Sequence, residues 1–244
     1  MHKYKIEIEY DGTDFVGWQK QNNGTSIQEL IEKAVYEITG ENINIFGAGR
    51  TDAGVHALAQ VAHFELLKEF KIDNIRDGIN QILRPKPIAL LNVEQIDQNF
   101  HARFSAKKRT YEYKIINRRS PLTLQKNKAW IVFKKLDIEK MQFESSFFIG
   151  KHDLESFRSV DCQSKSATKT IDEIKFEKNN DYLSIFFTAK SFLHSQVRIM
   201  VGTLVDIGKG KITKSIDEII KNKDRSQAGM TAPACGLYLK KIEY

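Results

Sequence analysis

A cation, a hydroxyl and a carboxylate follow one another at Arg50, Thr51 and Asp52, among three glycines within eight residues. Glycine can adopt positive φ and lets the backbone lie close to a ligand. The residues at 43–46 and 58–64 have strand-like composition, which predicts a tight connection between two strands. A carboxylate held there is rigid enough to act as a nucleophile or to stabilise positive charge. The alternative is an ordinary turn, because Asp beside Gly often caps backbone N–H groups.

A reacting carboxylate must stay ionised in a dry pocket. Burial raises the pKa of a carboxyl group, whereas a cation within about 4–6 Å lowers it by roughly 1–3 units. Arg50 lies two residues away on the same loop, and Arg198 lies far along the chain among Val197, Ile199, Met200 and Val201. A charge in such apolar surroundings needs a partner. The residues by themselves leave both arginines open as the partner of Asp52.

Composition limits the possible functions. The chain has 244 residues and a formal net charge of +7, enough for one large domain or two small ones. No apolar run approaches the roughly 18–20 residues of a membrane span, and no signal-peptide core is present, so we expect a cytoplasmic protein. Cys162 and Cys235 have no metal-ligand spacing, and the six histidines are scattered, which makes a zinc site unexpected. Basic residues are spread out, which predicts a folded surface for structured RNA.

Hydrophobic periodicity predicts an α+β fold. In the first half we expect a strand at 3–10, a helix from a capping box at Ser26 and Glu29 to Gly40, the two strands around Asp52, a helix at 74–83, and strands at 88–93 and 109–116. This order is β-α-β-β-α-β-β, with helices that can all cover one face of a sheet.

The second half has similar content. We expect a helix from Asp137 to about 149, strands at 169–176 and 182–189, helices at 192–207 and 215–221, and a last strand at 236–242. The polar run 117–121 is the best candidate for a junction by composition. We divide the chain into an N-terminal half, 1–106, which carries the glycine-rich loop, and a C-terminal half, 107–244.

Several motifs extend along nearly the whole chain in one order. They are Tyr10-Asp11-Gly12-Thr13 with Gly17-Trp18-Gln19, the loop Gly49-Arg50-Thr51-Asp52-Ala53-Gly54-Val55-His56-Ala57, Phe100-His101-Ala102-Arg103-Phe104-Ser105-Ala106 with Arg109-Thr110-Tyr111, Val197-Arg198 with Val201-Gly202, and Ala232-Pro233-Ala234 with Gly236-Leu237-Tyr238-Leu239. In these motifs the sequence resembles the tRNA pseudouridine synthases of the TruA type.

The resemblance implies a fold and an activity. The fold is two ferredoxin-like α+β halves whose mostly antiparallel sheets join around a central catalytic cleft. The activity is the isomerisation of uridine to pseudouridine at positions 38–40 in the anticodon arm of tRNA, by a homodimer. This reaction needs no oxidant and no external energy, so no cofactor is expected.

The resemblance also implies residue roles. Asp52 is the nucleophile, Arg198 its partner, and Arg50 a contact to RNA. Tyr111 stacks on the extruded uracil or takes part in proton transfer. Taken by itself, a tyrosine on an alternating strand is more often a core residue. Arg109 and Leu237 are implied to line the substrate site.

Other positions differ from the family or have more ordinary readings. Thr110 stands where the family usually has a basic residue, and 193–196 departs from its His-His-Met pattern, so the role of His194 stays open. We favour a structural role for His56. Tyr238 is a pocket residue or plain strand core.

Two other classes of protein were weighed. A catalytically silent RNA-binding protein has no need to desolvate a carboxylate such as Asp52. A glycosidase or nucleoside hydrolase usually needs a second acid to protonate the leaving group, and no second carboxylate stands out near Asp52.

Overall fold

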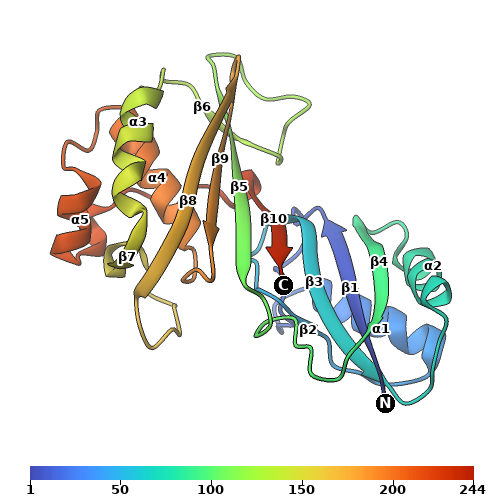
Figure 1. The fold of residues 1–244 in the computed structure, drawn as a ribbon. Coiled ribbons are helices and arrows are strands. Elements are labelled where there is room, and N and C mark those ends of the chain that lie inside the picture. Colours follow the sequence, from blue (N-terminus) through green and yellow to red (C-terminus); the bar gives the residue numbers. More distant parts are fainter. The chain divides into compact units, whose positions relative to one another are not determined.

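The computed structural model describes residues 1–244, and the chain divides into two compact units (Figure 1). The first comprises Met1–Lys107 with Tyr238–Tyr244, and the second comprises Lys108–Leu237. The last strand belongs with the first unit because Tyr238 pairs with His56 in a parallel ladder. None of the helices is long and apolar enough to cross a membrane.

The first unit is built on β1 (His2–Tyr10). β1 pairs antiparallel with β3 (His56–Leu66) and with β4 (Ile88–Ile96). The short β2 (Phe46–Gly47) pairs antiparallel with β3, and β10 (Leu237–Glu243) pairs parallel with β3. The alternation predicted for β1 is confirmed on its buried side, at Tyr4, Ile6, Ile8 and Tyr10. Lys3, expected on the polar side, is also buried, because its ammonium group donates to the carbonyls of Gln98 and Phe100.

Helices α1 (Ile27–Thr39) and α2 (Ile72–Leu83) complete this unit and contact each other. Both occur where the sequence predicts them, and α1 ends at Gly40 with φ +73°. The predicted capping box at Ser26 is only half formed. Its hydroxyl accepts the N–H of Glu29, but the Glu29 carboxylate pairs with Lys33 at 2.7 Å. A two-sided capping box occurs instead at Ser215 and Glu218, at the start of α5 (Ile216–Asn222).

The strands of the second unit also pair mostly antiparallel. β5 (Lys108–Asn117) pairs with β9 (Tyr182–Ala189), β9 with β8 (Thr168–Asn179), and β8 with β7 (Gly150–Asp153). The short β6 (Trp130–Val132) runs parallel to β5. Figure 1 shows α3 (Ile138–Ser145), α4 (Gln196–Gly208) and α5 on one side of these strands. Both units are therefore α+β, as predicted.

Two helices of this unit differ from the prediction. α3 ends at Ser145 and continues as a 3-10 turn, Ser146–Phe148, short of the expected end near 149. α4 begins at Gln196 instead of 192, because Ser195 has φ +56° and interrupts the helix there. Every residue of α4 except Arg198 and Asp206 is buried. β6 and β7 are too short to show a periodic pattern, and the sequence did not predict them.

Candidate active site

Asp52 lies on the connection between β2 and β3, as the glycine-rich sequence predicts. The N–H of Val55 donates to the carbonyl oxygen of Asp52 at 3.1 Å, and Gly54 has φ +77°, which closes a tight turn. Thr51 and Val55 are buried on either side, whereas Asp52 is half-buried. The loop therefore fixes its backbone in the protein and leaves the carboxylate partly open to a ligand.

The end of β1 and the segment after it pack against this loop. The hydroxyls of Tyr10 and Thr51 are 2.8 Å apart, and the N–H of Trp18 donates to the carbonyl of Thr51 at 3.1 Å. A Cβ on Gly12 would lie 2.0 Å from the Val55 carbonyl oxygen. A Cβ on Gly17, which has φ +111°, would lie 2.5 Å from the Thr51 oxygen. Only glycine permits this close approach of two backbones.

The other side of the loop rests on β3 and on Trp18. The N–H of Ala48 donates to the carbonyl of Val61, and the Gln60 amide donates to the carbonyl of Gly49 at 2.9 Å. Trp18 is 2% exposed. Its indole packs directly against Gly47, where an added Cβ would lie 2.6 Å from Nε1. From the sequence, Trp18 is known only as part of a motif. Its contact with Gly47 shows that it supports the loop.

His56 is fully enclosed in the same support. Its ring stacks on Tyr238 with centroids 4.6 Å apart. Nδ1 lies 3.0 Å from the Gly12 nitrogen and 2.9 Å from Oδ1 of Asp11. The N–H of Gly12 needs a lone pair on Nδ1, whereas a hydrogen bond to the Asp11 carboxylate needs a proton there, so the ring serves one partner at a time. These contacts tie His56 to the segment under the loop, in keeping with the structural role expected for it.

Arg50 differs from Asp52 in its surroundings. It is exposed, although it is only two residues away along the loop. An exposed guanidinium on a rigid loop is suited to contact phosphate or base oxygens of an RNA.

Four of the six predicted site residues lie in the second unit. Tyr111 and Arg109 are both on β5 and both buried. The Tyr111 ring meets Phe192 edge to face, with centroids 5.3 Å apart. The Arg109 guanidinium donates to the carbonyl of Lys190. Sequence patterns did not single out Phe192, which lies on the irregular chain before α4.

Arg198 is half-buried and is the cation of the apolar helix α4. Its Nε donates to the carbonyl of Ala232 at 2.8 Å. Leu237 is buried and begins β10, directly after the 3-10 turn Ala234–Gly236. The motif around Ala232 and the motif around Arg198, far apart in sequence, therefore meet within this unit.

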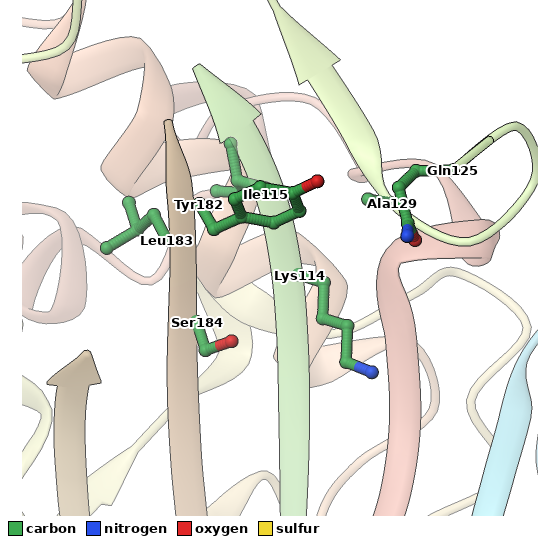
Figure 2. A pocket seen from close by; sticks show the side chains of 7 residues that line it. All are labelled: Lys114, Ile115, Gln125, Ala129, Tyr182, Leu183 and Ser184. Atoms are coloured by element: carbon green, nitrogen blue, oxygen red, sulfur yellow. The ribbon is translucent and has the colours of Figure 1, made fainter. Parts of the chain in front are cut away.

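A separate pocket of about 240 Å³ lies beside β5 and β9. Figure 2 shows its lining from two strands and from the chain before β6: Lys114, Ile115, Gln125, Ala129, Tyr182, Leu183 and Ser184. None of the predicted site residues lines it.

Two of the six histidines come together, against the expectation from their spacing. The rings of His63 and His101 lie 4.7 Å apart, because the chain after β4 folds back onto β3. Nδ1 of His63 accepts the N–H of Ala102. Burial, together with the charges of His101 and Lys3, lowers the pKa of His63 to about 4. No group of three metal-ligating side chains forms here or elsewhere.

The architecture and the loop define an α+β protein that presents a carboxylate on an inter-strand turn, and known proteins are similar to this chain over nearly its whole length. The family described as tRNA pseudouridine synthase matches residues 6–105 and 146–244. The tRNA pseudouridine synthase A of Ehrlichia canis is 52% identical over 99% of this chain and 100% of its own. That of Wolbachia pipientis wMel is 50% identical over 99% and 100%. That of Parvibaculum lavamentivorans is 47% identical over 100% of both.

The chain belongs to the tRNA pseudouridine synthase family, and the resemblance seen in its motifs is confirmed. It is an isomerase of uridine in tRNA.

Proposed function

We propose that the protein converts uridine to pseudouridine at positions 38–40 in the anticodon arm of tRNA, with Asp52 as the nucleophile and no cofactor. The observation that carries this proposal is the position of Asp52. Its carboxylate is half-buried on a turn whose backbone is held by Gly12, Gly17 and Trp18. Such rigidity suits a group that must be aimed at one atom of a substrate.

The chemistry balances without a redox partner. The bond between N1 of uracil and C1′ of ribose breaks, and a bond between C5 and C1′ forms. The proton on C5 leaves, and N1 gains one. The Asp52 carboxylate attacks either C1′ of the ribose or C6 of the uracil, and in both routes it departs when the new bond is complete.

Residues of the second unit supply the other roles in this proposal. The Arg198 guanidinium keeps Asp52 ionised, since a nearby cation favours the charged form of a carboxylate. Tyr111 stacks on the extruded base or passes a proton, and Arg109 and Leu237 complete the substrate site. The two halves, each ferredoxin-like, would close on one cleft that holds Asp52.

Binding of tRNA rests on charge and on base extrusion. The formal net charge is +7, and the exposed Arg50 lies two residues before Asp52. The target base must leave its stack at a cost of a few kcal/mol, and phosphate contacts offset this cost. We further propose that the protein acts as a homodimer with the tRNA contacting both subunits. A complex with the molar mass of one chain plus one tRNA, measured by light scattering, would contradict the dimer.

The test of the catalytic role uses the Asp52→Asn variant. The amide keeps the size of the side chain but removes its charge and nucleophilicity, so turnover should vanish while tRNA affinity stays near that of the parent protein. Pseudouridine is mapped in tRNA after incubation, with Asp77→Asn on α2, an exposed carboxylate outside the loop, as the matched control. Activity of Asp52→Asn within tenfold of the parent protein would remove Asp52 from the nucleophile's role. Product only outside positions 38–40 would remove the site assignment.

A further inference from the structure

The segment that follows α5 lies directly on α4. The N–H of Gly229 donates to the hydroxyl of Thr203 at 2.8 Å, and Thr203 is fully buried. A Cβ on Gly202 would lie 1.8 Å from the carbonyl oxygen of Met230. A Cβ on Gly229 would lie 2.7 Å from Cα of Thr203. The backbones of the helix and the segment are thus in direct contact. A shift of residues 228–232 would therefore also displace residues of α4.

Residue 232 of this segment holds Arg198 at two points. The N–H of Ala232 donates to the carbonyl of Arg198 at 3.1 Å, and Nε of Arg198 donates to the carbonyl of Ala232 at 2.8 Å. The first contact fixes the backbone and the second fixes the side-chain torsions up to the guanidinium. Because the guanidinium is planar, a fixed Nε–H also fixes the plane in which its terminal nitrogens lie.

Arg225 holds the same segment from its other side. Its Nη1 donates to the carbonyl of Gly229 at 2.9 Å and approaches that of Ala228 at 3.5 Å. Its Nη2 donates to the hydroxyl of Thr231 at 3.3 Å. The three partners are neutral groups immediately before Ala232. Arg225 is half-buried, and burial lowers the pKa of its guanidinium, which shows that the fold takes this charge partly out of water.

A second clamp acts at the end of the segment. The hydroxyl of the buried Tyr113 donates to the carbonyl of Pro233 at 2.7 Å. Tyr113 lies on β5, so the segment is tied to the sheet there and to Arg225 at its start.

We propose that Arg225 is a positioning residue for Arg198, acting through the backbone of residues 228–232. This inference rests on the proposed role of Arg198 in catalysis. Arg225 fixes the carbonyls and hydroxyl of the segment, the segment fixes the carbonyl of Ala232, and that carbonyl sets the plane of the Arg198 guanidinium. Without the contacts of Arg225, the guanidinium of Arg198 can turn.

The direct measurement is solvent exchange of the Arg198 Nε–H in protein labelled with ¹⁵N-arginine. Its signal is assigned by its loss in Arg198→Met. Exchange should become at least about tenfold faster in Arg225→Met, since the Ala232 carbonyl that accepts from Nε is no longer held in place. Arg225→Lys should restore little, because an ammonium group lacks the planar fork that reaches three acceptors.

The matched control is Arg158→Met. Arg158 is also half-buried in this unit and donates to the carbonyls of Cys162 and Ser164, but it holds a different loop. It should leave the Arg198 signal unchanged. Tyr113→Phe removes the second clamp without removing a charge, and it provides the test if Arg225→Met fails to fold; it too should speed the exchange.

Single-turnover rates separate this inference from the proposed function. Arg225→Met should slow the reaction by about 10- to 100-fold and shift the acid limb of the pH–rate profile in the same direction as Arg198→Met, with no further shift in the double variant. An Arg198 signal unchanged in folded Arg225→Met and Tyr113→Phe overturns the inference. Suppose that exchange is faster in Arg225→Met, but the acid limb stays in place in both Arg225→Met and Arg198→Met. This result supports the positioning role of Arg225 and overturns the catalytic role of Arg198.

Discussion

The two arginines proposed for the site stand in contrasting surroundings. Arg50 is exposed on a glycine-rich loop, whereas Arg198 is half-buried in a helix whose neighbouring residues are all apolar or buried. An exposed guanidinium such as that of Arg50 can contact solvent and a polyanion. A half-buried guanidinium such as that of Arg198 is suited to pair with a group of the protein itself.

Replacement of each arginine by methionine should therefore have a different signature. If Arg198 is the cation that pairs with the reacting carboxylate, as proposed, Arg198→Met should move the acid limb of the single-turnover pH–rate profile to higher pH. In Arg50→Met productive tRNA binding should weaken and the salt dependence should flatten, with the acid limb in place. An acid limb that moves in Arg50→Met and stays in Arg198→Met would mean that the two roles are reversed.

Among the elements, the turn after β1 matters most for the loop. Gly17 has φ +111° and lies against Thr51 and Asp52, whose backbone atoms would be 2.5 and 3.2 Å from a Cβ at this position. The loop therefore depends on a glycine that lies outside it in sequence.

Gly17→Ala should lower the free energy of unfolding by about 1–3 kcal/mol and should also reduce kcat, because the added methyl group displaces the backbone that carries Asp52. Gly40→Ala is the control. Gly40 has φ +73°, but nothing lies within 4 Å of its Cβ position, so it should lose stability with kcat unchanged. Denaturant titration and steady-state rates measure the two effects. Equal losses of kcat in both variants would remove the link between Gly17 and the loop.

The contact between β3 and the chain after β4 should respond to acid. His63 has a pKa of about 4 in the folded protein because of burial, His101 and Lys3, against about 6.5 when unfolded. Between these values the unfolded chain binds the extra proton, so stability is complete above about pH 6.5 and falls as the pH drops toward 4, by an amount on the order of 2 kcal/mol.

The variant His63→Asn keeps an acceptor for the Ala102 N–H, because its amide oxygen occupies the position of Nδ1, but it does not titrate. Its urea midpoint should therefore fall less between pH 6.5 and 4.5 than that of the parent protein. Equal slopes in both proteins would show that His63 does not cause the acid sensitivity.

For the whole molecule, the net charge of +7 governs encounter with tRNA. If several phosphates are contacted, the logarithm of the binding constant should fall steeply with the logarithm of the salt concentration. Fluorescence titration of labelled tRNA at four salt concentrations measures the slope, and activity should survive EDTA. A flat salt response, or activity lost to the chelator, would contradict the proposed binding or the cofactor-free reaction.

The sequence by itself determined most of the elements and the place of Asp52. Long amphipathic segments such as β1, α1 and α2 are visible because their buried residues recur at a regular period. The loop is visible because glycines and a carboxylate are concentrated in one short stretch. Errors fall where local patterns compete with tertiary contacts, as at the start of α4, where Ser195 adopts φ +56° inside an apolar run.

Only the tertiary structure decided what supports the site. The approach of Gly17 to Thr51, the meeting of His63 with His101, and the clamp of Arg225 on the segment that holds Arg198 each join residues without a common period. Such contacts depend on the distance between backbones after folding, and local patterns carry no information about that distance.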